Sequence, residues 1–292
     1  MNRALANFIM RGRAQAILIA VLIIPLIPQA ALALVTLRRG ALEGLMLLPW
    51  AILPTLVMLW GDEGIVALAV PSVVTLVGVF AGAMLLRLQA GWALAAVSLA
   101  GICLLSGGLY QLLFDSTVTQ LLDQWIELQK QALDARGMDY DESQLNLPPN
   151  RDFIGLGALG MGINMVLALV LGRWWQALLY NPGGFRQEFS QLRLTPLQAL
   201  LCTAATALCL VNQNYRLWAL IPALPLVLVS VAVAHQFAAV QRMGRTWLVI
   251  FYIALANMPF YLAIALLGLL DTWMDMRGRL IGRRHKKEQD KD

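Results

Sequence analysis

The stretch Leu217–Val240 reads LWALIPALPLVLVSVAVAHQFAAV and contains no Asp, Glu, Lys or Arg. A helix needs about 20 consecutive apolar residues to cross a hydrocarbon core of about 30 Å, and this stretch is long enough to do so. Because the apolar run is continuous and does not alternate, it predicts a helix and not a barrel strand. Further blocks of the same kind are Ala14–Thr36, Ala41–Trp60, Gly64–Leu86, Gly91–Phe114, Phe153–Tyr180, Pro196–Val211 and Trp247–Leu270.

The composition excludes a water-soluble domain. Of the 292 residues, 59% are hydrophobic and 13% are charged, and the mean hydropathy is +0.68. Soluble domains carry about 25% charged residues. The sequence therefore predicts an all-α polytopic integral membrane protein, in which residues 1–292 form a single transmembrane helical domain built as a bundle from eight hydrophobic blocks.

The sequence offers little for catalysis or metal binding. Cys103, Cys202 and Cys209 all lie inside apolar blocks, which is typical of small core residues and not of disulfides. With only two His residues, a His-based metal cluster is excluded. The chain shows no Ser-His-Asp, paired-carboxylate or HExxH pattern. We therefore expect no catalytic residue, no metal, no cofactor and no enzymatic activity.

The basic residues predict the orientation in the membrane. The net charge is +5, and Lys and Arg cluster beside the apolar blocks and in a basic tail at residues 277–292. This pattern follows the positive-inside rule and does not indicate nucleic-acid binding. If the first and last blocks each double back, the basic residues left outside are Lys130, Arg136, Arg151 and Arg216. We therefore expect a bacterial inner-membrane protein with both termini in the cytoplasm.

Proline interrupts the first and last blocks. Pro25 and Pro28 lie in the first block, and Asn257 with Pro259 lies in the last. Proline breaks helices, and about 24 residues at 1.5 Å each make only one crossing as a helix. Each end block is therefore either a shallow re-entrant hairpin or, alternatively, an ordinary kinked span. Freed backbone groups cannot face lipid, so we expect both breaks to face the bundle interior.

Residues 115–152 form the one long polar segment between blocks, and its charge is mostly acidic. Its first half has apolar residues at helical spacing, including Val118, Leu122 and Trp125, and Ser116 or Thr117 precedes them as a cap. The sequence predicts an extracytoplasmic loop that contains an amphipathic helix. That helix lies on the membrane surface or packs on neighbouring loops.

A turn of unusual composition follows the fifth block. Asn-Pro-Gly-Gly is turn chemistry, since Pro fixes one torsion and Gly accepts a positive φ. The turn is either anchored at the lipid boundary by Arg173, Trp174 and Trp175, or it serves as a docking surface for a cytoplasm-facing protein partner. The candidate docking residues are Asn181, Pro182, Gly183, Gly184, Phe185 and Arg186.

Polar residues inside the blocks are few. Asn164 and Asn257 are candidates for hydrogen bonds between helices and, less commonly, for contacts with a small-molecule ligand. Asp271 and Asp275 are spaced to share one helix face, and we expect Leu270–Arg284 to be an interfacial amphipathic helix.

Three stretches resemble the YybS-like family of uncharacterised bacterial membrane proteins. They are Thr36–Gly44, Arg173–Arg186 and Gly268–Arg277. That family is distantly similar to the substrate-binding S components of energy-coupling-factor transporters, which are helical bundles that dock on a cytoplasmic module. The resemblance implies a transport-type substrate-binding membrane protein. The alternative is a non-enzymatic scaffold or assembly factor that binds protein partners.

Overall fold

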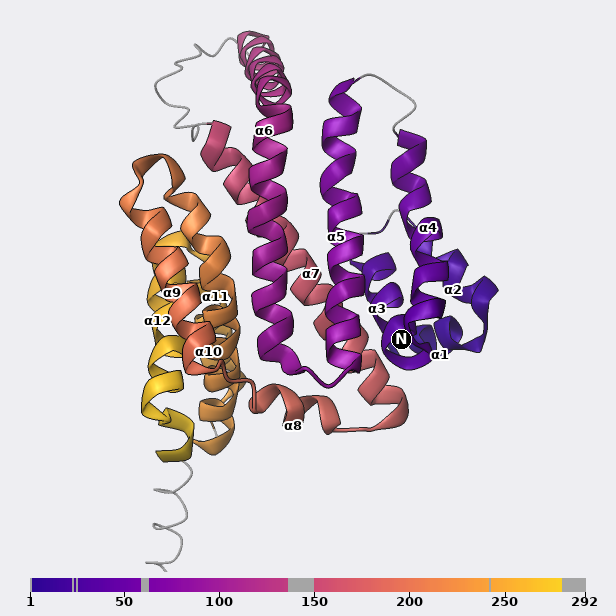
Figure 1. The fold of residues 1–292 in the computed structure, drawn as a ribbon, viewed down its shortest axis with the longest axis vertical. Coiled ribbons are helices and arrows are strands. Elements are labelled where there is room, and N and C mark those ends of the chain that lie inside the picture. The colour runs from indigo at the N-terminus through magenta and orange to yellow at the C-terminus, as the bar shows by residue number, and fades with distance from the viewer. Residues whose placement is uncertain are drawn as a thin grey trace, which may run out of the picture.

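The computed structural model describes residues 2–22, 24, 26–58, 63–135, 150–241 and 243–279, and these residues form helices and no strand (Figure 1). The all-α prediction is therefore confirmed. In chain order the α-helices are α1 Asn2–Arg11, α2 Arg13–Ala20, α3 Ile27–Arg39, α4 Ala41–Met58, α5 Glu63–Arg87, α6 Gly91–Asp134, α7 Asn150–Tyr180, α8 Gly184–Ser190, α9 Pro196–Val211, α10 Leu220–Val240, α11 Arg245–Ala256 and α12 Met258–Met274, with the short 3₁₀ turns Gln213–Tyr215 and Leu217–Ala219 before α10.

Several helices are long and apolar enough to cross a membrane. Within the described residues these are Ala69–Arg87, Gly91–Leu133, Asn150–Tyr180 and Leu217–Val240, and a fifth candidate exists if α11 and α12 count as one broken span. Helices α4 and α9 are apolar but shorter. These lengths and compositions indicate a multi-pass membrane protein. They do not establish eight spanning blocks, because the first and last blocks are each divided into two helices.

Helices α3 and α7 form the centre of one half of the molecule. Residues Ala30 to Leu37 of α3 are all buried. The backbone of α7 comes close to α3 at Gly172, where an added Cβ would lie 2.7 Å from the Ala33 side chain and 2.9 Å from the Ala30 carbonyl oxygen. Glycine at position 172 permits this contact, because small residues let two helices pack closely.

The first block doubles back. Helix α2 ends at Ala20, and α3 begins at Ile27 after a break in which Leu26 has a φ of 72°. Arg39, the last residue of α3, donates a hydrogen bond to the Met10 carbonyl near the end of α1 at 2.6 Å. The chain thus returns to the end of the bundle from which it started. Pro28 lies in the first turn of α3 and not in the break, while Pro25 lies outside the described residues.

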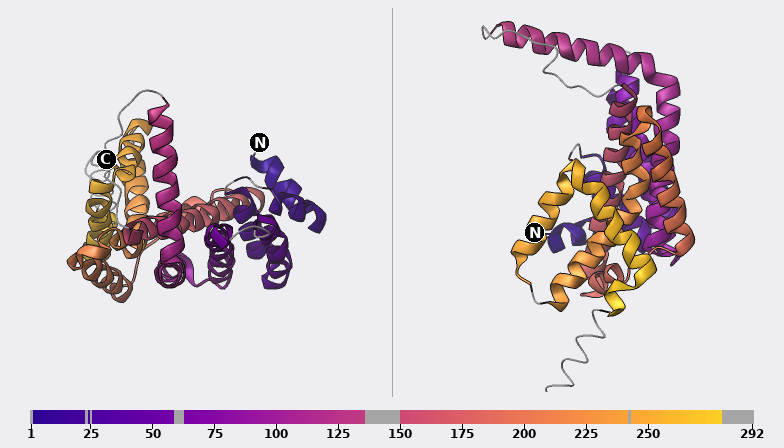
Figure 2. Two further views of the ribbon diagram at one scale, coloured as in Figure 1. Left: turned by 90° about the horizontal axis from the view of Figure 1, so that it is seen from above. Right: turned by 90° about the vertical axis from the view of Figure 1, so that its left-hand side faces the viewer.

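The last block doubles back as well. Helices α11 and α12 meet at Asn257 and are bent by 115°. The beginning of α11 lies beside the end of α10, where the rings of Trp247 and Phe237 are 6.2 Å apart. The end of α12 lies beside the segment before α9, where Arg193 pairs with Asp275. The two helices therefore form a hairpin whose ends lie at the same end of the bundle, and the right-hand view of Figure 2 shows this hairpin from the side.

The polar segment 115–152 departs from its prediction. No separate amphipathic helix starts at Ser116 or Thr117, because α6 continues without a break to Asp134. The stretch from Phe114 to Asp134 contains no Gly or Pro, so nothing local stops the helix. In the right-hand view of Figure 2, the last turns of α6 lean away from the direction of its first turns. Residues 136–149 lie outside the described part of the chain.

Candidate functional site

A large groove lies between the α11–α12 hairpin and the body of the bundle. Its volume is about 1040 Å³, near the upper end of the range for ligand pockets. Its walls are single faces of helices, as the spacing of Leu248, Tyr252 and Leu255 on α11 shows. The apolar lining residues on α7 and α10 are Leu159, Ile163, Val166, Leu167, Val170, Leu220, Leu224, Val227, Leu228, Val231, Ala238 and Ala239.

One end of the groove is polar. Helix α8 supplies Arg186, Gln187 and Ser190 there, and α10 and α11 supply His235 and Tyr252. His235 Nε2 and the Tyr252 hydroxyl oxygen are 2.7 Å apart and share a hydrogen bond. Arg186 has no hydrogen-bond or ion-pair partner among the described residues, and none of the lining residues is a carboxylate. This end of the groove therefore presents an uncompensated positive charge.

The Tyr261 side chain on α12 contributes a polar atom that the fold does not satisfy. Tyr261 is 7% exposed and lines the groove, and its hydroxyl has no hydrogen-bond partner within the described chain. Leaving a buried hydroxyl unpaired costs about 1–3 kcal/mol. Because the hydroxyl oxygen is itself shielded from solvent, a bound molecule would pair with it only after a local shift of the side chain.

Helix α8 is held firmly against the bundle. Arg173 of α7 and Glu188 of α8 form an ion pair at 2.5 Å, and the indole nitrogen of Trp92 donates to Glu188 at 3.0 Å. The ring of Trp92 also packs edge-on against Phe185 at 6.2 Å and Phe189 at 5.9 Å. These contacts from α6 and α7 fix the helix that carries Arg186, while the Arg186 side chain itself is exposed.

The candidate docking turn divides into parts with different surroundings. Asn181, Pro182 and Gly183 are exposed, and Gly183 has a φ of 89°, as turn chemistry predicts. The expectation of a positive φ does not hold for Gly184, where the constraint is steric because an added Cβ would collide with the Asn181 side chain. Phe185 packs against Trp92, and Arg186 lines the groove. A docking role for the turn stays a prediction. Arg173 pairs with Glu188 of α8, and Trp175 is 1% exposed, so Trp175 belongs to the core and does not anchor the turn at a lipid boundary.

The candidate residues Asn164 and Asn257 make no hydrogen bond between helices among the described residues. The Asn164 side-chain oxygen is buried without a partner. Asn257 is exposed, and its amide donates to the Ile253 carbonyl of its own helix at 2.6 Å. The expectation that this break faces the bundle interior is therefore wrong for Asn257. Its neighbours Ala256 and Met258 do line the groove, so the break borders that space.

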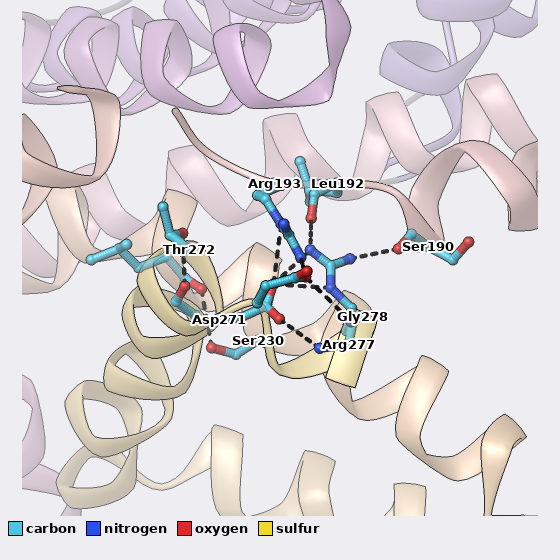
Figure 3. Close-up of polar contacts among 11 residues, drawn as sticks. Ser190, Leu192, Arg193, Ser230, Asp271, Thr272, Arg277 and Gly278 are labelled. Atoms are coloured by element: carbon cyan, nitrogen blue, oxygen red, sulfur yellow. Dashed lines mark hydrogen bonds and ion pairs between the residues drawn. The ribbon is translucent and has the colours of Figure 1, made fainter. Parts of the chain in front are cut away.

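A buried ion pair closes the end of α12 (Figure 3). Asp271 Oδ2 lies 2.7 Å from Arg277 Nη2, and Arg277 also donates to the carbonyls of Ser190 at 2.5 Å and Leu192 at 2.8 Å. Arg193 reaches the same Asp271 carboxylate at 3.7 Å. We call Asp271, Arg277 and Arg193 the C-terminal clamp. Because Ser190 also lines the groove, the clamp fixes one side of the polar end.

The expectation of one interfacial helix over Leu270–Arg284 is wrong, because the helix is interrupted at Asp275. Helix α12 ends at Met274, and Asp275 has a left-handed φ of 48°. Asp271 is 0% exposed and Arg277 is 4% exposed, so Arg277 belongs to the folded core and not to a solvated basic tail. The rest of that tail, residues 280–292, lies outside the described chain.

Sequence reasoning missed Tyr261, His235 with Tyr252, and the clamp. Their blocks are almost uniformly apolar, so no helical periodicity indicates which face is internal. One signal in the sequence could have indicated the clamp. Asp271 ends an apolar block and is followed closely by Arg277 and Arg279, and this spacing permits a local ion pair.

The comparisons with known proteins identify no relative. No protein-family model matches the chain, and neither a curated protein nor a solved structure is significantly similar to it.

Proposed function

We propose that this chain is a transport-type substrate-binding protein of a bacterial inner membrane and that it holds a small amphipathic molecule in the groove. It acts by binding and not by catalysis. The single observation that carries the proposal is the groove itself, which combines apolar walls, one polar end and an unpaired buried hydroxyl at Tyr261.

The positions of the helix ends support the orientation in this proposal. Arg13, Arg39 and Arg87 lie close together at one end of the bundle. Arg39 donates a hydrogen bond to the Met10 carbonyl, and Arg87 donates one to the Leu37 carbonyl. Arg13 forms an ion pair with Glu43 at the start of α4. Helix α8 lies across the same end in Figure 1, and the chain's last described residues emerge there. The positive-inside rule assigns this end to the cytoplasm.

The shape of the groove supports binding over a purely structural role. A scaffold needs only an outer surface, and its interior can be closely packed. Here α11 turns one apolar face toward an open space between itself and α10. The alternative of a scaffold or assembly factor rests on the exposed outer part of α6. The resemblance to the YybS-like family, and through it to S components, remains part of the proposal.

The test compares two Val→Phe variants of the purified full-length protein. Val231 lines the groove on α10, whereas Val249 is 55% exposed on α11 and does not line it. Native mass spectrometry in mild detergent identifies what remains bound to the wild type, to Val231→Phe and to Val249→Phe. We expect the wild type and Val249→Phe to carry the same small molecule and Val231→Phe to lose it.

Two results would contradict the proposal. One is equal retention by all three proteins, which would place the bound molecule outside the groove. The other is an empty wild type that binds no added amphipath while it co-purifies with a stoichiometric protein partner, which would favour the scaffold alternative. Thermal unfolding of each variant shows whether the substitution has left the fold intact.

A further inference from the structure

We propose that the groove takes an anionic lipid, with the acidic headgroup at Arg186 and an acyl chain along the apolar walls. This inference rests on the proposed function and specifies the ligand class. It assigns Arg186 as the residue that selects the headgroup, with the His235–Tyr252 pair beside it.

The charges around the groove favour an anion. Among the described residues that line the groove, Arg186 carries the one permanent positive charge, and none of these described residues is an Asp or a Glu. Other arginines near this end are already engaged, since Arg173 pairs with Glu188 and Arg193 pairs with Asp275. Arg186 has no such partner in the described chain. A guanidinium presents a fork of donors that matches phosphate and carboxylate oxygens.

The dimensions favour a lipid over a small soluble anion. The α10 wall from Leu220 to His235 is about 22 Å long at 1.5 Å per residue. One leaflet accounts for half of a hydrocarbon core of about 30 Å, so an acyl chain fits along this wall. The walls are apolar, and the lining residues Ile163 and Leu167 are 37% and 48% exposed, so they offer apolar surface to a bound chain. A free phosphate would leave that surface unused.

The arrangement places the headgroup where a lipid would have it. Helix α8, which carries Arg186, lies across one end of the bundle (Figure 1). The Arg173–Glu188 ion pair and the Trp92 contacts hold the α8 backbone in place, so only the exposed Arg186 side chain has to be ordered at the moment of binding.

The experiment measures lipid affinity by native mass spectrometry titration of the full-length protein. The probes are phosphatidylglycerol and phosphatidylcholine with identical acyl chains, and glycerol phosphate as the headgroup without chains. The variants are Arg186→Ala, Arg186→Lys and, as a matched control, Arg38→Ala. Arg38 is exposed and stacks on Tyr180 at 4.1 Å, outside the groove.

We expect the wild type to bind phosphatidylglycerol about tenfold more tightly than phosphatidylcholine, as one charge-assisted contact allows. Arg186→Ala should lose this preference, Arg186→Lys should keep part of it, and Arg38→Ala should keep all of it. Equal affinity of the wild type for the two lipids would overturn the inference, as would an equal loss in Arg186→Ala and Arg38→Ala. Binding of glycerol phosphate as tight as that of the lipid would show a soluble anion site instead.

Val231→Phe separates this inference from the proposed function. If that variant loses both lipids while the wild type shows no headgroup preference, the groove binds amphipaths and only the role of Arg186 is wrong. If Val231→Phe binds both lipids as the wild type does, the groove is not the site and the proposed function fails with the inference.

Discussion

Asp271 and Arg277 form an ion pair at 2.7 Å in which the carboxylate side chain is 0% exposed and the guanidinium side chain is 5% exposed. The two residues are close in sequence, but Arg277 also donates to the carbonyls of Ser190 and Leu192, which lie far away along the chain. The pair therefore attaches the end of α12 to the segment that joins α8 to α9. It fixes the α11–α12 hairpin at its free end, beside the polar end of the groove.

Breaking this pair should destabilise the protein strongly. Removal of one partner leaves the other charge buried, at a cost of about 3–5 kcal/mol. We expect Asp271→Asn to lower the thermal unfolding temperature in detergent and to make the C-terminal hairpin sensitive to protease. The control is Glu43→Gln, since Glu43 pairs with Arg13, whose side chain is 64% exposed. If Asp271→Asn melts with the wild type, the clamp does not stabilise the hairpin.

Two glycines of α7 should respond differently to alanine. An added Cβ at Gly172 would lie 2.9 Å from the Ala30 backbone oxygen, whereas at Gly160 it would meet nothing within 4 Å. Alanine is favoured over glycine in a helix interior by about 1 kcal/mol. Gly160→Ala should therefore hold or raise the unfolding temperature, and Gly172→Ala should lower it by separating α3 from α7. Equal effects of the two substitutions would refute this close contact.

Replacement of Tyr261 by Phe should separate stability from binding. The variant loses only a hydroxyl, and that hydroxyl has no protein partner within the described chain. The unfolding temperature of the empty protein should stay the same or rise, because an unpaired buried polar group is removed. Retention of the bound molecule in native mass spectrometry should fall. A large loss of stability with unchanged retention would show that the hydroxyl serves the fold and not a ligand.

Reporter fusions test the orientation. A phosphatase that is active only outside the cytoplasm can be joined after Asp134, after Asn212 or after Arg279. The first two positions follow helices that run away from the arginine-rich end, and the third lies at that end. We expect activity at Asp134 and Asn212 and none at Arg279. An active reporter at Arg279 would reverse the assigned sides, and with them the leaflet in which the groove opens.

The sequence predicts helices best where a local signal marks their ends. The block Pro196–Val211 coincides with α9, because Thr195 and Gln198 form a capping box at its start and Asn212 follows its end. The doubling back of both end blocks agrees with the charge pattern, and in the last block Pro259 lies in the first turn of α12, directly after the break. The end of the fourth block was missed because α6 carries no breaker between its apolar and amphipathic parts.

The candidate site depends on tertiary packing and could not be predicted in the same way. Arg186 was singled out from the turn that precedes it, but its place in the groove is set by Arg173, Glu188 and Trp92 on three different helices. Asn257 was expected to face inward, yet it satisfies its amide within α11 and is exposed. Block hydrophobicity gives no information on which face of a uniformly apolar helix points inward.

The most direct test of a ligand-binding groove is photo-crosslinking with an anionic lipid that carries a diazirine in its acyl chain. After illumination, mass spectrometry locates the labelled residues. We predict adducts at groove residues such as Val231 and Leu248, displaced by excess unlabelled lipid and absent from Val231→Phe. Adducts spread evenly over outward residues such as Val249 and Leu208, which are 55% and 75% exposed, without competition by unlabelled lipid, would contradict the account.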